Sequence, residues 1–277
     1  MNLHTALRQG TKLLEEASVP AARLTAEVLL GHAMKVRREY FYAHPEEELT
    51  ELAWIHYGRY LHERISGKPT QYITRQQEFY GRPFFVSPAV LIPRPETEHV
   101  VETALRLAPG AQRIVDVGCG SGAIAVSLAL EIAGSKVAAC DISLDALRVA
   151  ERNATSNGAH VAFVQCDLLS AFASGSMDLV ASNPPYVPEG DEANLQREIR
   201  EHEPAVALYG GPTGNEIYAR LIPQAERVLR PGGWLIMEMG WRSLDAVKAM
   251  FGEGWHNVED VADLAGIPRV LAAQRRS

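Results

Sequence analysis

The sequence predicts an α/β protein: a mostly parallel sheet covered by helices on both faces, with a small N-terminal helical bundle joined to it by a β-hairpin. Three observations predict this fold. From Arg113 onward, short apolar strands alternate with helical segments. Residues 1–67 repeat apolar residues at spacings of three and four, and residues 70–93 are rich in aromatic and β-branched residues around Gly81. We therefore expect a helical domain over 1–67, a hairpin linker over 68–95 and the α/β domain over 96–277.

The composition is that of an ordinary globular protein. Of the 277 residues, 47% are hydrophobic and 22% charged, which excludes collagen-like, coiled-coil and wholly disordered chains. No stretch reaches 18 apolar residues, and the start lacks the apolar segment of a signal peptide, so we expect a cytoplasmic protein. The net charge of −7 argues against a large nonspecific grip on nucleic acid.

The helical bundle is predicted from apolar residues such as Leu24 with Val28, and Leu52 with Ile55. After the linker, Pro93 and Pro95 end the hairpin and a helix is expected over 96–107. The expected strands of the sheet are 113–117, 136–140, 161–165, 178–182, 233–239, 255–260 and 269–274. The expected helices between them are 122–133, 144–157, 214–229 and 243–251. Ligands of such sheets bind at the carboxyl ends of the strands.

A glycine-rich turn follows the first strand of this sheet. Glycines allow a sharp turn and a close approach of the backbone to a ligand, although a tight turn without a ligand explains the same residues. The turn lacks the pattern GxxxxGK[ST], so ATP hydrolysis is not expected. Its residues are Gly118, Cys119, Gly120, Ser121 and Gly122.

Acidic residues end the next two strands. Asp141 lies about 20 residues beyond the glycines, where its carboxylate can accept hydrogen bonds from two ribose hydroxyls. Asp167 can meet an adenine amino group, and Leu168 can flank the ring. With the glycine turn, these residues predict an adenosine pocket. The three cysteines, Cys119, Cys140 and Cys166, fit neither a zinc site nor a disulfide framework.

The fourth strand ends in Asn183, Pro184, Pro185 and Tyr186. Neither proline has an N–H group, so this stretch of backbone offers carbonyl acceptors alone. The Asn183 side-chain oxygen and the Pro184 carbonyl can each accept one hydrogen of a planar –NH2 group, while Tyr186 can stack on the group that carries it. A carboxylate has no hydrogens to give and would be rejected. The alternative is a proline-rich loop that closes the sheet, with Asn183 as a turn residue.

Several motifs together resemble one protein family. They are QYI (71–73), EFYG (78–81), VLIPRPETE (90–98), DVGCGSGAIA, CDIS, CDLL, SNPPY, EPAVAL (203–208), PGGWLIMEMG and DLAG (263–266). Over residues 70–275 the chain resembles the protein-(glutamine-N5) methyltransferases that modify class-1 peptide chain release factors. These are class I S-adenosylmethionine-dependent methyltransferases.

The resemblance implies a Rossmann-like class I methyltransferase sheet and a defined reaction. A methyl group passes from S-adenosylmethionine to the side-chain nitrogen of a glutamine, that of the release factor GGQ motif, and leaves S-adenosylhomocysteine. Asn183, Pro184, Pro185 and Tyr186 are implied as catalytic. The implied cofactor residues are Gly118, Cys119, Gly120, Ser121, Gly122, Asp141, Asp167, Leu168 and Asn183. No metal, membrane or direct nucleic-acid partner is expected, and the helical domain is the expected docking platform for the release factor.

Three other functions stay open at this point. A related methyltransferase modifies a glutamine of a large-subunit ribosomal protein, and an adenine-N6 nucleic-acid methyltransferase also needs an acceptor wall. The third is a cofactor-sensing adaptor without catalysis, which would not need an intact SNPPY motif. Arg94, Glu96 and Glu238 are either substrate contacts or structural braces.

Overall fold

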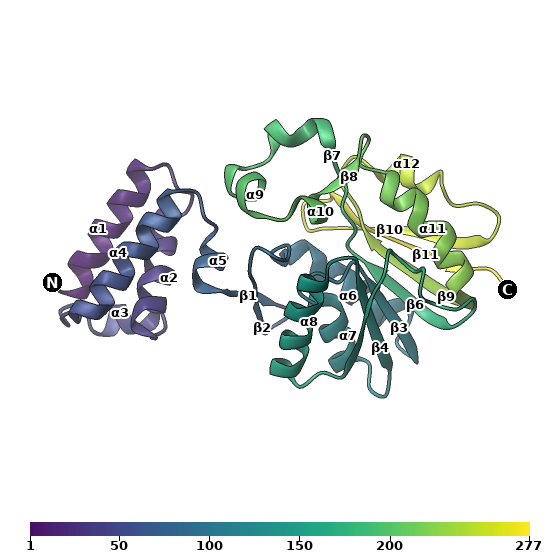
Figure 1. The fold of residues 1–277 in the computed structure, drawn as a ribbon, viewed down its shortest axis with the longest axis horizontal. Helices are drawn as coiled ribbons and strands as arrows, with labels where there is room; N and C mark the ends of the chain where they lie inside the picture. The colour runs from purple at the N-terminus through teal and green to yellow at the C-terminus, as the bar shows by residue number, and fades with distance from the viewer. The chain divides into compact units, whose positions relative to one another are not determined.

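The structure is a computed structural model that describes residues 1–277, and it divides into two compact units. The first unit consists of Met1–Arg75 and the distant segment Gln196–His202. The second consists of Gln76–Leu195 and Glu203–Ser277. Figure 1 shows the elements of both units. None of the helices combines the length and the apolar composition that a membrane crossing requires.

The first unit is helical throughout. Its elements are α1 (Leu3–Glu16), α2 (Ala22–Met34), α3 (Glu39–Ala43), α4 (Glu51–Ile65), α5 (Thr70–Thr74) and α9 (Arg197–His202). The two longest helices begin at side-chain caps: Asn2 accepts from the Thr5 N–H at 2.9 Å and Thr50 from the Ala53 N–H at 3.2 Å. The core of the unit contains the fully buried Leu3, Leu14, Leu29, Leu30 and Tyr57.

The sequence pattern identifies these helices but not all of their buried faces. Leu24, Leu52 and Ile55 are 44%, 66% and 59% exposed, so they do not belong to the core. Instead, α2 is buried through Leu29 and Leu30, among others. Apolar residues in α2 and α4 occur on more than one side of the helix, and spacing alone cannot tell which side is covered.

The helical unit extends beyond the predicted boundary at residue 67. The short helix α5 belongs to it, because Ile73 lies in the same buried cluster as the three long helices. The segment that contains α9 also belongs to it: Arg64 Nη2 forms an ion pair with Glu198 at 2.5 Å, and Arg197 Nη2 donates to the Ser66 carbonyl at 3.2 Å. Nothing in the local sequence around α9 indicates a contact with residues 130 positions earlier.

The second unit begins with a β-hairpin. Strand β1 (Gln76–Phe79) pairs antiparallel with β2 (Arg82–Phe85) across Tyr80 and Gly81, which both have positive φ, 50° and 70°. Positive φ at both central residues is the geometry of a two-residue hairpin turn that matches the twist of the strands. Phe79 and Phe84 are buried, and their rings meet edge to face with centroids 6.0 Å apart.

A seven-stranded sheet forms the centre of this unit, with the strand order β10-β11-β9-β6-β3-β4-β5. The neighbouring strands from β9 to β5 are parallel, and β11 and β10 are antiparallel. The strands are β3 (Arg113–Val117), β4 (Lys136–Asp141), β5 (Val161–Gln165), β6 (Met177–Ser182), β9 (Leu229–Glu238), β10 (Trp255–Ala262) and β11 (Pro268–Arg275). The predicted α/β fold with a mostly parallel sheet is therefore confirmed.

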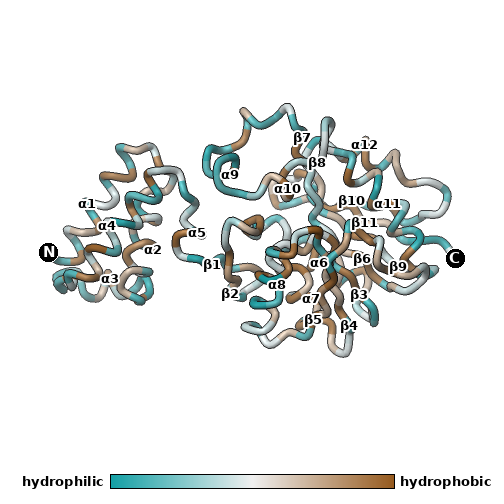
Figure 2. Tube along the Cα trace, viewed as in Figure 1, coloured by the Kyte–Doolittle hydropathy of each residue, from teal (hydrophilic) through white to brown (hydrophobic).

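Helices cover both faces of the sheet. One face packs against α6 (Glu98–Leu107), α7 (Ala123–Glu131) and α8 (Leu144–Asn157), and the other against α11 (Glu216–Val228) and α12 (Leu244–Lys248) (Figure 1). Ile114 and the next residue, Val115, belong to different buried clusters, as the two-residue period of a strand requires. The central strands are accordingly hydrophobic on both sides, and appear mostly brown in Figure 2.

The chain order places a crevice beside β3. From β3 the chain proceeds to β4 on one side, whereas β6 lies on the other side, so the strand order reverses at this point. Ligands of open α/β sheets bind at such reversals, outside the carboxyl ends of the strands. The second unit also contains five shorter elements. One of them, η1 (Pro95–Thr97), precedes the sheet in the chain. The other four lie between β6 and β9: β7 (Val187–Pro188), η2 (Glu189–Asn194), α10 (Ala205–Leu208) and β8 (Tyr209–Gly211).

Candidate active site

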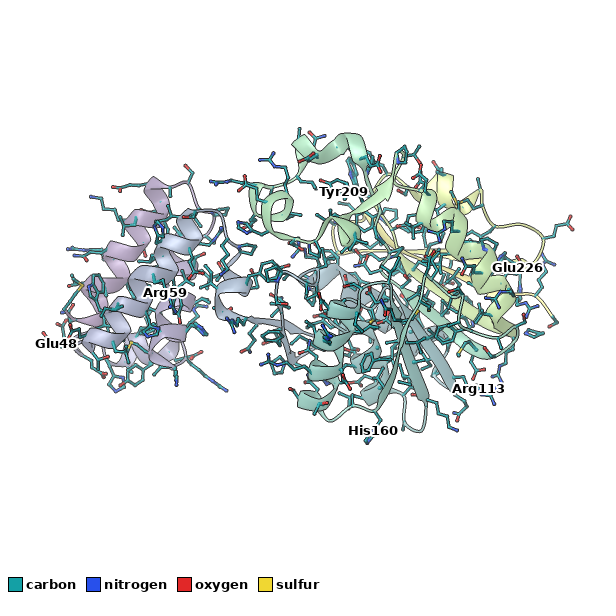
Figure 3. The ribbon with its side chains drawn as sticks, in the orientation of Figure 1. Glu48, Arg59, Arg113, His160, Tyr209 and Glu226 are labelled. Carbon is teal, nitrogen blue, oxygen red and sulfur yellow. The ribbon has the colours of Figure 1, made fainter.

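A cavity of about 330 Å³ lies at the carboxyl edge of the sheet in the second unit. Figure 3 shows Tyr209, one of its lining residues, on the side of the unit away from Arg113, which begins β3. Most of the predicted site residues meet there. Those that line the cavity are Gly118, Cys119, Gly120, Ser121, Asp141, Asp167, Leu168, Asn183 and Pro185. Gly122, Pro184 and Tyr186 are not among the lining residues.

The glycine turn provides a bare backbone surface. Gly118 and Gly120 have φ of 67° and 52°, and a Cβ atom added at either would meet no atom of the protein within 4 Å. The turn is held against β4, because the N–H groups of Gly118 and Cys119 both donate to the Cys140 carbonyl, at 2.8 and 3.0 Å. A side chain at either glycine would project into open space. This cradle therefore fits a ligand that approaches the backbone closely.

Gly122 has a different reason to be a glycine. It has φ of 80° at the N-terminus of α7, and an added Cβ would lie 3.0 Å from the Cβ of Ala150 on α8. Its place in the turn thus allows two helices to pack closely. We find no contact of Gly122 with the cavity, although the sequence grouped it with the other two glycines.

Asp141 ends β4 with its carboxylate at the cavity wall. One oxygen, Oδ2, accepts from the Gly120 N–H and the other, Oδ1, from the Ser143 N–H, both at 2.9 Å. Burial raises the pKa of Asp141, and these backbone N–H groups act in the opposite direction. A carboxylate has about four acceptor positions, so two hydrogen bonds leave it able to bind a diol.

Asp167 and Leu168 follow β5 at the same cavity. Asp167 is half-exposed and forms an ion pair with Arg220 of α11, which also lines the cavity. Leu168 has φ of 48°, a strained backbone conformation for a branched side chain, and its carbonyl accepts from the thiols of Cys140 and Cys166 at 3.2 Å. No motif in the sequence indicates Arg220, which lies 53 positions beyond Asp167 on an amphipathic helix.

The residues of the SNPPY motif are divided between the cavity and the core. Asn183 and Pro185 line the cavity, and Pro184 is buried. The hydroxyl of Tyr186 lies 3.3 Å from Glu238 Oε1 and donates to it. Burial raises the pKa of this phenol above its usual value, and the nearby Glu238 carboxylate acts in the same direction. Tyr186 is therefore a neutral donor that is held by β9.

Two buried carboxylates support the wall of the cavity. Glu203 accepts from Arg94 Nη2 at 2.5 Å and from the Ile92 N–H at 3.2 Å, and thereby joins the segments before η1 and α10. Glu238 is 3% exposed and accepts from the hydroxyl of Thr97 at 2.5 Å. The geometry favours the role of a structural brace for Arg94. Thr97 and Glu203 lie within the VLIPRPETE and EPAVAL motifs, but no sequence spacing indicates their partners, which lie 141 and 109 positions away.

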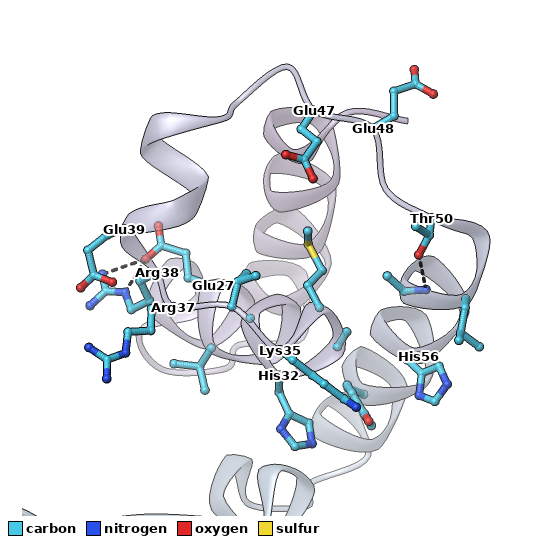
Figure 4. Close-up of a pocket in the computed structure, with 18 residues that line it drawn as sticks. Glu27, His32, Lys35, Arg37, Arg38, Glu39, Glu47, Glu48, Thr50 and His56 are labelled. Atoms are coloured by element: carbon cyan, nitrogen blue, oxygen red, sulfur yellow. Dashed lines mark hydrogen bonds and ion pairs between the residues drawn. The ribbon is translucent and has the colours of Figure 1, made fainter.

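A larger hollow of about 980 Å³ lies in the first unit (Figure 4). It contains none of the predicted site residues, and its polar side chains include the ion pair of Arg38 with the buried Glu27 at 2.7 Å. The site residues predicted from the sequence therefore gather at the smaller cavity and not at this hollow. Nowhere in residues 1–277 do three or more His, Cys, Asp or Glu side chains form a group that could hold a metal ion.

Two family models match the chain: the PrmC N-terminal domain over residues 5–74 and the methyltransferase small domain over 99–206. Over 278 residues the chain is 46% identical to the release factor glutamine methyltransferase of Koribacter versatilis, covering 99% of each chain. The chain belongs to the release factor glutamine methyltransferase family. A second member, from Nitratidesulfovibrio vulgaris, is 44% identical and covers 97% of this chain and 94% of its own.

Solved structures share the fold of this family member at lower identity. A methyltransferase from Pyrococcus furiosus superposes with a TM-score of 0.55 at 21% identity, covering 72% of this chain and 90% of its own. The 16S rRNA N2 G1207 methyltransferase of Thermus thermophilus, solved with AdoMet and guanosine, gives a TM-score of 0.53 at 20% identity and covers 73% and 50%. These similarities establish the class I methyltransferase fold of the second unit.

Proposed function

We propose that this protein transfers a methyl group from S-adenosylmethionine to the side-chain nitrogen N5 of a glutamine in a class-1 release factor, the glutamine of its GGQ motif. The observation that carries the proposal is full-length similarity at 46% identity to an enzyme of that name, together with a cavity that gathers the predicted residues. Because release factors act on the ribosome, the proposal places the enzyme in the cytoplasm.

The cavity residues fit S-adenosylmethionine. Gly118 and Gly120 leave room for its close approach, Asp141 would accept from the ribose hydroxyls, and Asp167 with Leu168 would hold the adenine. Cys119 and Ser121 line the cavity beside these glycines. When bound, the cofactor supplies a methyl group on a positively charged sulfur, and its product is S-adenosylhomocysteine.

The acceptor wall would orient the substrate amide. The Asn183 Oδ1 atom and the Pro184 carbonyl would each accept one hydrogen of the glutamine –NH2 group. Pro185 lines the same cavity, and Tyr186, the next residue, is held by its hydrogen bond to Glu238. An amide nitrogen is a poor nucleophile because its lone pair is shared with the carbonyl. Correct positioning of two reacting groups supplies about 7–11 kcal/mol of a barrier, so the wall can act without a strong base. Its acceptors also stabilise the positive charge that develops on the nitrogen.

The helical unit would provide the remaining recognition. We propose that residues 1–67 dock the release factor, because a cavity that reads a single side chain does not by itself select one protein. Its surface carries exposed apolar residues, among them Leu52, Trp54 and Ile55 on α4. Exposed apolar patches are typical of protein interaction surfaces.

The substrate assignment is tested by methyl transfer from labelled S-adenosylmethionine. The protein is incubated separately with a class-1 release factor, the same factor with the GGQ glutamine replaced by glutamate, a large-subunit ribosomal protein and adenine-containing DNA. We expect label on the unmodified release factor alone. Preferential labelling of the ribosomal protein or of DNA would contradict the proposal, and no transfer in any incubation would favour a non-catalytic adaptor.

A further inference from the structure

A buried hydrogen-bond chain begins at the side chain of Asn183. Its Nδ2 atom donates to Thr97 Oγ1 at 3.0 Å, and Thr97 Oγ1 donates in turn to Glu238 Oε2 at 2.5 Å. Thr97 is 5% exposed and Glu238 3%, and both Thr97 and Asn183 line the cavity. Asn183 directly follows β6, Thr97 ends η1 and Glu238 ends β9. Three parts of the chain that are distant in sequence therefore meet at one amide.

The chain of donors has a fixed direction. An ionised carboxylate can only accept hydrogen bonds, so the single proton of the Thr97 hydroxyl must be directed to Glu238. The Thr97 oxygen is then left with lone pairs and can only accept from Asn183. The –NH2 end of the Asn183 amide therefore faces Thr97, and its oxygen is turned the other way.

The surroundings of Glu238 support its part in this chain. Its second oxygen accepts from the Tyr186 hydroxyl at 3.3 Å, and its backbone carbonyl accepts from the Tyr218 hydroxyl at 3.0 Å. Burial raises the pKa of Glu238 to about 7. The hydrogen bonds from Thr97 and Tyr186 and the charge of Arg269 lower this pKa, and the charge of Glu96 raises it.

We propose that Thr97 and Glu238 are positioning residues that fix the direction of the Asn183 amide, so that its oxygen accepts from the substrate –NH2 group and the site selects glutamine over glutamate. This proposal rests on the proposed function. A reversed Asn183 amide would present its own –NH2 group, which suits a carboxylate and repels the hydrogens of glutamine. Sites built around hydrogen bonds discriminate strongly, because the wrong partner leaves buried groups unpaired.

Protonation of Glu238 would release this control. A neutral carboxyl group has a hydroxyl that must donate to a neighbour, and if it donates to Thr97, the Thr97 proton turns toward Asn183 and favours the reversed amide. The ionised form is therefore the active one. Its population falls as the pH drops through the pKa of Glu238, so kcat/KM should decline on the acid side.

Thr97→Val and Thr97→Ser test the hydrogen-bond chain from Asn183 to Glu238. Valine has nearly the shape of threonine but no hydroxyl, whereas serine keeps the hydroxyl. We expect Thr97→Val to lower kcat for release-factor methylation at least about tenfold, as expected for the loss of one hydrogen bond, and Thr97→Ser to restore most of it. Thermal unfolding and titration with S-adenosylmethionine control for folding and cofactor binding.

A competition assay measures the selectivity directly. The release factor with glutamate in place of the GGQ glutamine serves as an unreactive inhibitor, and its inhibition constant is compared with the KM of the normal substrate. The ratio of the inhibition constant to the KM should fall at least about tenfold in Thr97→Val, because selectivity against glutamate is lost, and stay unchanged in Thr97→Ser. An unchanged ratio and kcat in Thr97→Val, or an equal loss in Thr97→Ser, would overturn the proposal.

Glu238→Gln provides an independent readout that does not depend on its absolute rate. Because glutamine does not titrate near neutral pH, the acid limb of the kcat/KM profile should disappear in this variant. An identical limb in both proteins would show that Glu238 does not control the amide. If the wild-type protein does not methylate the release factor at all, the proposed function is itself wrong. If the wild-type protein methylates it but the variants behave as the wild type does, only the positioning role of Thr97 and Glu238 is wrong.

Discussion

At the scale of single residues, Asn183 is the side chain on which the proposed chemistry most depends. Asn183→Ala removes one of the two acceptors for the substrate amide. Turnover should fall by about 10²- to 10³-fold, the effect of losing one preorganised hydrogen-bonding group in an active site. Single-turnover methylation of a release factor measures this. Asn194→Ala, in the exposed loop of η2, is the matched control, and wild-type turnover in Asn183→Ala would disprove the role.

The proposal assigns Asp141 to cofactor binding rather than to the transfer step. Asp141→Ala removes the acceptors expected to hold the ribose hydroxyls and should weaken binding of S-adenosylmethionine by about 1.5–3 kcal/mol, the range for a hydrogen bond to a charged group. Isothermal titration calorimetry gives the affinity. The control is Asp145→Ala in the first turn of α8, where the carboxylate is exposed and pairs with Arg148 at the surface. Equal affinity of the two variants would refute the assignment.

The burial of Asp116 predicts how the stability of the folded protein depends on pH. It is fully buried, its Oδ2 accepts from the Ala125 N–H at 3.0 Å and its Oδ1 has no partner. Burial raises the pKa of Asp116 from 3.8 to about 7. The folded protein therefore holds a proton that the unfolded chain has lost, and this contribution to stability is complete below about pH 4 and declines as the pH rises through about 7.

Asp116→Asn should remove this contribution, because asparagine keeps an acceptor for Ala125 and does not ionise. Between about pH 5 and pH 7, the unfolding free energy of the wild type should fall more steeply than that of the variant, by at most about 1.4 kcal/mol per pH unit. Urea unfolding at several pH values provides the slopes. Parallel slopes for the two proteins would show that Asp116 does not carry the proton.

The residues that sequence analysis located are those whose role depends on local chain geometry. Gly118 and Gly120 lie in the turn just after β3, and Asp141 ends β4, so all three lie at the carboxyl edge of the parallel sheet, where ligands bind. Thr97 and Arg220 act through partners distant in sequence, and no spacing rule indicates such contacts. The stacking of Tyr186 on the substrate stays a prediction, and the structure adds the hydrogen bond of its hydroxyl to Glu238, which lies 52 positions away.

At the scale of elements, the ion pair of Arg94 with Glu203 holds the segment before η1 against the segment before α10. Arg94→Ala would leave a buried carboxylate without its cation and should destabilise the protein by about 1.5–3 kcal/mol. Urea unfolding measures the loss. Arg106→Ala, whose partner Glu259 is also a carboxylate but lies exposed, should cost less than about 1 kcal/mol. Equal costs would mean that burial of Glu203 adds nothing.

The strands were easier to predict than the faces of the N-terminal helices. A buried parallel strand is a short apolar run between turns, and β3, β5 and β6 lie within one residue of their expected ends. The buried side of a helix depends on which neighbours cover it. For α2 and α4 this information is tertiary: Leu24 and Ile55 belong to the apolar spacing that predicts the helices, but both side chains lie exposed.

At the scale of the whole molecule, the two units divide the work in the proposal. The second unit has its own two buried clusters, and every residue that lines the cavity belongs to it. Deletion of residues 1–67 should therefore leave the affinity for S-adenosylmethionine within about threefold and abolish methylation of the intact release factor. Calorimetry and a methylation assay test the two parts. Undiminished methylation by the truncated protein would exclude a docking role for the helical unit.

The segment Gln196–His202 constrains how this protein can be recombined with its relatives. The chain enters the helical unit twice, once as Met1–Arg75 and again as this short segment, which contacts α4 through Glu198 and Arg64. A hybrid that exchanged the N-terminal helices alone would join an arginine from one parent to a glutamate from the other. Under the proposed docking role, exchange of docking specificity between family members requires two separate stretches of the gene to be inherited together.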